Sequence, residues 1–522
     1  MMKKFLIACS LSCFSCLPGM AGDVGRLADS LVYRGEAQVT AGGGEHSPLW
    51  LNSNRYGLSS VDCDYGYLRG ALERPLSADD GRRWGVGYGV DIAGGYGMTS
   101  TVVLHQAFVE ARWLKGVLTI GSKEQPMELK NGELSSGSQT FGINARPIPQ
   151  VRLALPDYWT VPYTRNWLAI KGHLAYGKPT DTQWQKDFTQ MKSHFVEGDI
   201  YHGKAGYLRI GPKNITLELG LEMSCKFGGT SYASEKDRGT VSACNFKSFW
   251  HAFVPGGSDV NDGDPYLNTE GDNLGSWVAR LNFDYPKWNL GVYADHFFED
   301  HSSMLHLDYD GYGEGDKWNN KVTHRYFMYD FKDWMLGLEL KLKQNPYLHT
   351  IVVEYLYTKY QGGPIYHDHA KGNPIHICGR DNFYNHGYQT GWQHWGMVIG
   401  NPLYRSPLYN ENGAVRVLNN RFIAWHGGLS GNLMKGLHYR VLATWQRGWG
   451  TYGELFRDPE DNVSLLAEAS YHFATTSPLA GWSLKGAFAL DRGGIYGNNQ
   501  GMQLTIVKSG LLKKQSERRI RE

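Results

Sequence analysis

The stretch that decides the fold is ITLELGLEMSCKF, residues 215–227. Its odd positions carry Ile, Leu, Leu, Leu, Met, Cys and Phe, whereas its even positions carry Thr, Glu, Gly, Glu, Ser and Lys. A strand places all of these apolar residues on one face, and a helix would scatter them around its surface. Strands of soluble proteins usually run about 5–6 residues, whereas tilted transmembrane strands need about 9–11. The stretch therefore predicts a β-strand long enough to cross a membrane.

The same alternation recurs along the chain, and several apolar faces begin or end in Trp or Tyr, where membrane barrels carry their aromatic girdles. A soluble β-sandwich, whose inner faces also alternate, is the alternative. Seventeen strands can be counted in this way. They are 33–42, 65–72, 84–94, 102–113, 117–123, 166–176, 205–210, 214–226, 277–285, 289–297, 335–343, 350–359, 421–430, 437–446, 464–473, 482–491 and 501–511.

Connection lengths separate the two folds. Short turns alternate with long, polar, Gly-rich connections, which is the plan of an outer-membrane barrel and has no counterpart in a sandwich. The short turns are 211–214, 286–288, 344–349, 431–436 and 475–481, and the long connections are 228–276, 298–334, 360–420 and 447–463. Single-chain bacterial barrels have an even number of strands, so one strand is expected between residues 124 and 204. The prediction is an all-β protein, a transmembrane antiparallel β-barrel of about 18 strands.

The two ends of the chain differ from its body. Residues 1–21 read as a secretory signal peptide, with Lys3 and Lys4 before an apolar run and a small-x-small pattern at 19–21. Residues 513–522 form a basic tail, which leaves 22–512 as the barrel. The signal segment contributes +2 and the tail +3 to the formal net charge of +2, so the barrel carries −3. Nucleic acid is not expected as a partner. The expected partners besides a ligand are outer-membrane lipid and the barrel assembly machinery.

Enzyme and metal signatures are absent from the sequence. The stretch 361–409 is rich in His, at 367, 369, 376, 386 and 394, but has no HExxH or comparable ligand spacing. The acidic loops 259–270 and 308–319 fail as EF-hands, because Asp264 stands where Gly is required and Asn319 where Glu is. No GxSxG nucleophile motif occurs. We therefore expect no enzyme, no catalytic residue, no resident metal and no cofactor, while casual calcium binding by loop carboxylates stays open.

A Pro-rich segment, 144–165, is expected to stay out of central strands and to fold inward as a plug of the lumen. It carries Arg146, Arg152 and Arg165. Arginines on such a plug would either meet anionic groups of a ligand or pair with carboxylates of the barrel wall. The sequence leaves these two alternatives open.

The chain resembles the capsule assembly Wzi family. The matching stretches are 48–60, 122–164, 295–302, 360–369, 379–396, 399–407 and 439–453. The resemblance implies an eighteen-stranded outer-membrane barrel with a plugged lumen, which holds capsular polysaccharide at the cell surface as a lectin. Better-known members carry a periplasmic helical bundle before the barrel, whereas here the strand pattern starts near Tyr33. The basic tail also differs from barrels that end on an aromatic residue.

The function predicted is binding of capsular or extracellular polysaccharide in the outer membrane, and the alternative is a porin or sugar-uptake channel. Flat aromatic faces suit sugar rings, and cations suit acidic sugars. The longest loop gathers six such candidates, Arg380, Tyr384, Trp392, Trp395, Tyr404 and Arg405. The identity of the glycan, the oligomeric state and any pairing of the cysteines are left open.

Overall fold

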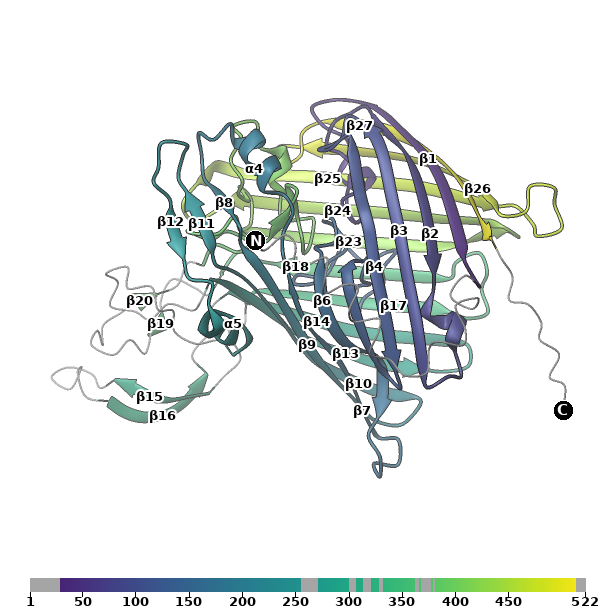
Figure 1. Ribbon diagram of the computed structural model, residues 1–522, viewed down its shortest axis with the longest axis horizontal. Coiled ribbons are helices and arrows are strands. Elements are labelled where there is room, and N and C mark those ends of the chain that lie inside the picture. Colours follow the sequence, from purple (N-terminus) through teal and green to yellow (C-terminus); the bar gives the residue numbers. More distant parts are fainter. Residues whose placement is uncertain are drawn as a thin grey trace, which may run out of the picture.

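The barrel is closed by its first and last strands. A computed structural model describes residues 29–254, 271–299, 307–312, 321–327, 332–361, 366–367, 377–378 and 381–512. Eighteen strands form one sheet, in which β1 (Val32–Gly43) pairs antiparallel with β27 (Asn499–Leu511) from Val32–Leu511 to Gly43–Gln500. Figure 1 shows these two strands side by side, which completes the ring. The prediction of an 18-stranded antiparallel barrel is confirmed.

The other barrel strands follow in chain order, each paired antiparallel with its neighbours. They are β2 (Tyr65–Arg74), β3 (Trp84–Tyr96), β4 (Val102–Trp113), β5 (Gly116–Ser122), β6 (Gln150–Thr160), β7 (Leu168–Gly177), β9 (Ile200–Ile210), β10 (Ile215–Phe227), β13 (Asp272–Asp284), β14 (Trp288–Glu299), β17 (Trp334–Leu342), β18 (Thr350–Tyr357), β23 (Phe422–Met434), β24 (Leu437–Gly450), β25 (Leu455–His472) and β26 (Trp482–Gly493).

Short elements lie in the connections. The strands among them are β8 (Phe195–Glu197), β11 (Gly229–Tyr232), β12 (Thr240–Ser242), β15 (Leu307–Tyr312), β16 (Lys321–Phe327), β19 (Tyr366–His367), β20 (Ile377–Cys378), β21 (Gln393–His394) and β22 (Met397–Val398). The helices are α3 (Leu49–Asn52), η2 (Leu76–Asp79), α4 (Thr182–Thr189), α5 (Phe246–Phe253) and η4 (Pro407–Tyr409). None of the helices in the described part of the chain has the length and apolar character needed to cross a bilayer.

The alternating stretch behaves as its pattern predicts. On β10 the side chains of Ile215, Leu217 and Leu219 are exposed on the outer face, at 36–41% of their full area. Glu218 and Glu222, on the opposite face, are buried inside the barrel. The first half of the strand thus presents its apolar face outward and its polar face to the lumen, as a membrane barrel requires. In the second half, Met223, Cys225 and Phe227 are buried, and Cys225 and Phe227 pack with Ala252 of α5.

The strand missing from the sequence-based count is β6, which lies within the segment predicted as a plug. Pro156 sits in a register shift between Leu155 and Trp159, where a missing N–H breaks no ladder hydrogen bond. The assignment of all of 144–165 to a lumen plug is therefore wrong. Arg152 belongs to β6, and Arg165 is exposed in the turn between β6 and β7.

One predicted long loop is also wrong. The connection expected at 447–463 shrinks to four residues, 451–454, because β24 continues to Gly450 and β25 begins at Leu455. A register shift between Gly448 and Gly450 accommodates this extension. Some predicted features lie outside the described residues: the acidic loop 259–270, most of the acidic loop 308–319, and the terminal segments 1–21 and 513–522.

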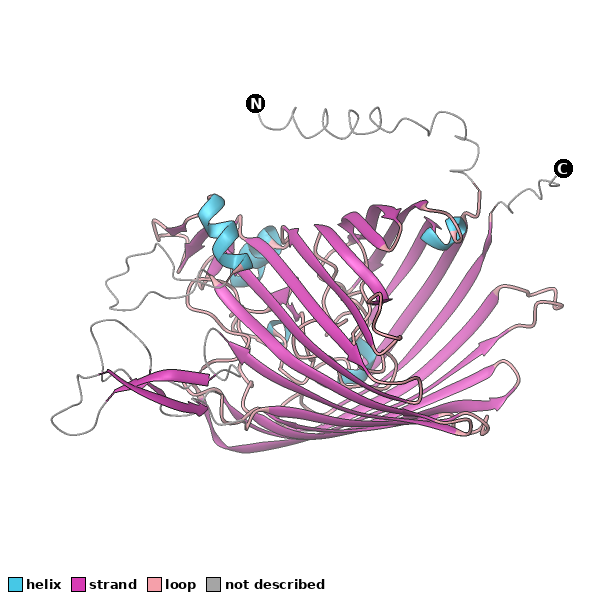
Figure 2. Ribbon diagram, turned by 90° about the horizontal axis from the view of Figure 1, so that it is seen from below, coloured by secondary structure: helices cyan, strands magenta, loops and turns pink. Residues whose placement is uncertain are grey.

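The main apolar core lies inside the ring of strands, where three connections meet the wall. Trp50, from connection 44–64, donates from Nε1 to Thr444 Oγ1 on β24 at 3.1 Å. Ser136, from connection 123–149, donates its backbone N–H to Glu354 of β18 at 2.8 Å. Figure 2 shows loop segments within the ring of strands. The long connections therefore pack onto the inward faces of the barrel as well as joining its strands.

Candidate functional site

A cleft of about 800 Å³ opens at the end of the barrel that carries the long connections. Its walls come from the segment after α4, from the β11–β12 hairpin and from two parts of the connection between β18 and β23. Most of its side chains are amides, hydroxyls and imidazoles. The polar and charged residues lining it are Ser193, His194, Ser231, Asp237, Thr240, Asn382, Asn385, His386, Tyr388, Gln389, Thr390, Asn412 and Arg416.

Hydrogen bonds fix the wall formed by residues 382–391. The Asn385 side chain donates to the carbonyl of Val417 and accepts from its N–H, both at 2.8 Å. His386 Nδ1 accepts from the backbone N–H groups of Tyr388 and Gln389, both at 3.1 Å. Gln389 Nε2 donates to Gly228 O at 3.0 Å, which ties the wall to the top of β10. The segment is therefore held in place before any ligand binds.

The facing wall is held by a different set of contacts. His194 Nε2 and Ser231 Oγ lie 2.9 Å apart and join the segment after α4 to the β11 strand. Burial, helped by the nearby His386, lowers the pKa of His194 below its ordinary value of 6.5, so the imidazole is neutral at pH 7. Asp237 accepts from the N–H of Ala233 at 2.9 Å. Backbone N–H groups lower the pKa of Asp237, which keeps it ionised.

The exposed groups of the cleft match a polyhydroxylated ligand. Tyr388 offers an aromatic ring that is 42% exposed, and Asn382 and Asn412 are exposed amides beside it. Arg416 and Asp237 contribute opposite charges, and Arg416 is also ion-paired with Glu454. An aromatic face with surrounding amides and hydroxyls can stack on and hydrogen-bond to sugar rings. With its charges balanced, the cleft is suited to hydroxyl-rich ligands rather than to densely anionic ones.

The same residues offer little for catalysis. Asp237 is the single carboxylate among the described residues that line the cleft, whereas glycoside hydrolysis uses a pair of carboxyl groups. In the described part of the chain, no group of three or more His, Cys, Asp or Glu side chains is arranged to hold a metal ion.

Three of the six predicted binding residues lie in the buried core. Tyr384, Trp392 and Tyr404 are at most 1% exposed. The rings of Tyr384 and Tyr404 stack with their centroids 4.0 Å apart, and Trp392 Nε1 donates to Thr140 O at 2.9 Å. Tyr384 also donates its hydroxyl to Gln139 O. These rings join connection 358–421 to connection 123–149 and present no free face to a sugar.

The other three have different positions. Trp395 is half-buried, donates to Thr180 Oγ1 at 3.1 Å and lies under the Arg146 guanidinium, whose carbon is 4.4 Å from its ring centroid. Arg405 donates to Ile495 O, Tyr409 O and Asn410 Oδ1 at 2.7–3.0 Å. Arg380 lies outside the described residues. None of the five described residues lines the cleft.

One wall of the cleft, residues 382–391, lies in the same His-rich stretch as the predicted binding residues, but its exposed members were not among them. The run Asn382-Phe-Tyr-Asn-His-Gly-Tyr388 combines amides and Gly, which is typical of an irregular polar turn. That composition was the available signal for an exposed segment. The predicted binding residues included the tryptophans of this stretch instead, although large aromatic side chains are often buried.

Of the three arginines predicted on the plug, Arg146 alone lies on an inward connection. Its guanidinium donates to Thr99 Oγ1, and burial lowers its pKa to about 10. Arg152 lines the inner wall from β6, and Arg165 is exposed in a turn at the opposite end of the barrel from the cleft. The segment thus does not act as one arginine-bearing unit.

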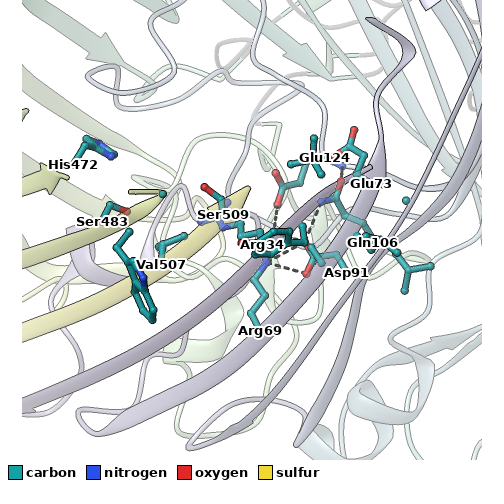
Figure 3. A pocket seen from close by; sticks show the side chains of 18 of the residues that line it. Arg34, Arg69, Glu73, Asp91, Gln106, Glu124, His472, Ser483, Val507 and Ser509 are labelled. Atoms are coloured by element: carbon teal, nitrogen blue, oxygen red, sulfur yellow. Dashed lines mark hydrogen bonds and ion pairs between the residues drawn. The ribbon is translucent and has the colours of Figure 1, made fainter. Parts of the chain in front are cut away.

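A second hollow, of about 740 Å³, lies at the barrel end that carries the short turns. Its charges are largely satisfied by each other. Figure 3 shows the side chain of Arg69 beside those of Asp91 and Glu124. Its Nε lies 2.9 Å from Asp91, and its Nη2 lies 3.1 Å from Glu124. Gln106 donates to Asp91 at 3.2 Å. This paired wall makes the hollow a weaker candidate for a ligand site than the cleft.

Comparisons with known proteins agree with the fold. A family model described as capsule assembly protein Wzi matches residues 29–315, more than half of the chain. A solved structure of Escherichia coli Wzi, described as an outer membrane protein involved in group 1 capsule assembly and a carbohydrate binding β-barrel, is similar with a TM-score of 0.51 and 12% identity. The alignment covers 93% of this chain and 85% of that chain.

Other solved structures are similar at a lower level. Pseudomonas aeruginosa OccK3 (OpdO) has a TM-score of 0.45 and 12% identity, covering 92% of this chain and 96% of its own. Pseudomonas aeruginosa OprD has a TM-score of 0.42 and 11% identity, covering 92% and 95%. At such identities the solved structures show the barrel fold alone. No curated protein sequence matches the chain.

Proposed function

Because the chain belongs to the capsule assembly protein Wzi family, we propose that it binds capsular or other extracellular polysaccharide and holds it at the cell surface. Family and closed barrel together locate the chain in the outer membrane. The similar barrel from Escherichia coli is described as carbohydrate binding, which supports the same class of ligand here. The observation that carries the proposal is the cleft at the long-connection end, with exposed Tyr388 among amides and hydroxyls.

The binding is non-covalent in this proposal, and the protein is not an enzyme. Tyr388 stacks on a sugar ring, while the side-chain NH2 groups of Asn382 and Asn412 donate to its hydroxyl groups. Trp395 and Arg405 are kept as secondary candidates because their side chains are only partly buried. The buried rings of Tyr384, Trp392 and Tyr404 support the site by holding the connections that carry it.

The lumen is closed in this proposal by the three inward connections, so the protein does not act as a channel. Support comes from the depth of their contacts. Lys130 and Asp295 of β14 form an ion pair at 2.7 Å with both side chains fully buried. His426 of β23 has Nε2 2.8 Å from Leu134 O. A porin or sugar-uptake channel needs a continuous aqueous path, and the channel alternative therefore predicts a large conductance.

Three further assignments complete the proposal. Residues 1–21 act as a signal peptide and 513–522 as a basic tail, and both lie outside the described residues. The barrel assembly machinery inserts the protein into the membrane. Outer-membrane lipid then covers the outer apolar face, to which exposed side chains such as Leu336 and Trp425 belong.

The test is a single substitution in the cleft. Tyr388→Ala removes the stacking face and should weaken binding of purified capsular polysaccharide by about 5–30-fold, equivalent to about 1–2 kcal/mol. Isothermal titration with the detergent-purified barrel measures this, and a glycan array identifies the sugar. Tyr347→Ala is the matched control, because Tyr347 is 65% exposed in a turn at the other end. Equal loss in both variants, or no loss in Tyr388→Ala, would contradict the assignment of the cleft.

A further inference from the structure

A third cavity, of about 160 Å³, lies inside the barrel between connection 123–149 and the strands β6, β7 and β9. A guanidinium and an imidazole of the wall lie there. Ala154 of β6 pairs with His173 of β7, and Arg152 pairs with Ala175, so the side chains of Arg152 and His173 share the inner face of neighbouring strands. Both residues line the cavity. It shares no lining residue with the cleft.

Among the described residues, no carboxylate forms an ion pair with the guanidinium of Arg152. The carboxylates nearest in the fold are already engaged. Glu128, which lines the cavity, is ion-paired with Lys171, and Glu110 lies 2.6 Å from Lys123. Enclosure in the barrel disfavours a guanidinium that has no ion pair of its own. An anion in the cavity would supply the missing partner.

A second guanidinium adds to the imbalance. Arg146 lines the same cavity from the inward connection, and its hydrogen bonds go to neutral groups, the Thr99 hydroxyl and the Gly57 carbonyl. It also lies over the ring of Trp395. The cavity thus has two arginines with no carboxylate paired to either in the described chain. Charge-assisted hydrogen bonds to a carboxylate would satisfy both.

The remaining wall selects among anions. Phe141, Ile148, Ile399 and three prolines give most of it an apolar surface, Tyr201 adds a ring, and polar groups come from Lys123, Gln125 and Gln150. A strongly hydrated inorganic ion would lose its water against such a wall without replacement. A carboxylate carried on a compact ring places its charge at the arginine and its body against the apolar side. The volume is below that of ordinary drug-sized pockets, which limits the ligand to about one monosaccharide.

We propose that this cavity binds a small organic carboxylate of the size of a sugar acid, with the carboxylate facing Arg152 and His173. The site is internal and therefore goes beyond the polysaccharide binding proposed for the cleft. A Tyr388→Ala variant should leave it intact, so failure of the one proposal does not decide the other.

The direct test titrates the detergent-purified barrel with D-glucuronate, D-glucose and inorganic phosphate. Saturable binding of D-glucuronate is expected, with D-glucose and phosphate each at least about tenfold weaker. Arg152→Gln should weaken D-glucuronate binding by at least about tenfold. Arg447→Gln is the control that removes the same charge from an exposed pair with Asp461. Absence of saturable D-glucuronate binding, equal binding of phosphate, or unchanged affinity in Arg152→Gln would overturn the proposal.

Thermal unfolding gives an independent readout. Without ligand, Arg152→Gln should melt no lower than the wild type, because it removes an unpaired charge. D-glucuronate should raise the midpoint of the wild type and leave that of Arg152→Gln unchanged. If Arg152→Gln does not assemble, His173→Gln serves as the second variant and should also lose the ligand-induced shift. A full shift in the variant that assembles would overturn the proposal.

Discussion

The guanidinium of Arg55 lies 3.1 Å from the carboxylate of Glu468, although 413 residues separate them in the sequence. Arg55 belongs to connection 44–64, whereas Glu468 is on the inner face of β25. Arg440 of β24 contacts the same carboxylate at 2.8 Å, and Lys485 of β26 lies 3.7 Å from it. One carboxylate thus contacts a cation from an inward connection and two cations from the wall.

Glu468→Ala should therefore destabilise the barrel by about 3–5 kcal/mol, because it leaves buried cations without their partner. Urea unfolding of the purified protein in detergent micelles measures this loss. Asp461→Ala is the control, since the Asp461–Arg447 pair is exposed on the outer surface. Exposed pairs contribute little, and this variant should unfold like the wild type. Similar midpoints for both variants would show that the Glu468 cluster does not hold the connection to the wall.

Two glycines set the close approach of connections 123–149 and 358–421. A Cβ on Gly142 would lie 2.5 Å from Gly400 O and 2.7 Å from Ile399 O, and these backbone atoms cannot move independently. Gly142→Ala should therefore cost about 1–3 kcal/mol through overpacking. Gly486→Ala on β26, where no atom lies within 4 Å of the added Cβ, is the matched control. Thermal midpoints of the two variants test this, and an unchanged midpoint for Gly142→Ala would contradict the close packing.

Much of the barrel could be predicted because its period is local. Alternation along β10 and tight turns such as 211–214 follow from neighbouring residues, and parity then required an eighteenth strand. The location of β6 could not be predicted. Pro156 argued against a strand, and only the register shift between β6 and β7 shows how a proline fits. That shift depends on pairing between segments, which the sequence of one segment does not display.

The candidate site was less predictable than the barrel. Trp392 and Tyr388 are four residues apart in one polar, aromatic-rich stretch, yet one is fully buried and the other is 42% exposed. The burial of Trp392 depends on connection 123–149, whose Thr140 carbonyl accepts a hydrogen bond from its indole N–H. Such a contact joins parts of the chain 252 residues apart. Residue type and local spacing give no information about it.

The stability of the connections should fall below pH 6.5. His394 is enclosed within them: its Nδ1 lies 2.8 Å from Arg146 O, and its Nε2 accepts from Thr180 N–H at 3.1 Å. Burial lowers the pKa of His394 below the ordinary 6.5, against the opposing pull of Asp181. The unfolded chain therefore takes up a proton near pH 6.5, which the folded chain takes up only at lower pH. The contribution to stability is complete above pH 6.5 and is lost as the pH falls.

Thermal midpoints between about pH 7.5 and pH 5.5 measure this effect, within the range where histidines titrate. One histidine contributes at most about 1.4 kcal/mol per pH unit. His46 and His194, whose pKa values burial also lowers, add in the same direction. His394→Gln should flatten the pH dependence by its share. The same slope in this variant and in the wild type would exclude His394 as a source.

Conductance separates the polysaccharide-binding proposal from the channel alternative. Substitution of Trp392 tests whether the inward connections are what blocks conduction. If the inward connections close the lumen as proposed, the wild-type protein should show no porin-sized conductance steps in planar bilayers. Trp392 is fully buried, donates to Thr140 O and stacks parallel to Tyr201 with centroids 6.0 Å apart. Trp392→Ala should cost about 3–5 kcal/mol of stability and loosen the contact between the two connections. Ion-conducting steps should then appear.

Trp425→Ala is the control, because Trp425 is 53% exposed on the outer face of β23. Its ring packs against that of Tyr355 on the neighbouring strand β18. Its conductance should match that of the wild type. Large steps in the wild type itself would contradict closure of the lumen and favour the channel. Removal of a buried indole leaves a cavity in a tightly packed region and should lower stability. A Trp392→Ala variant with normal stability and no conductance steps would therefore show that other contacts hold the connections.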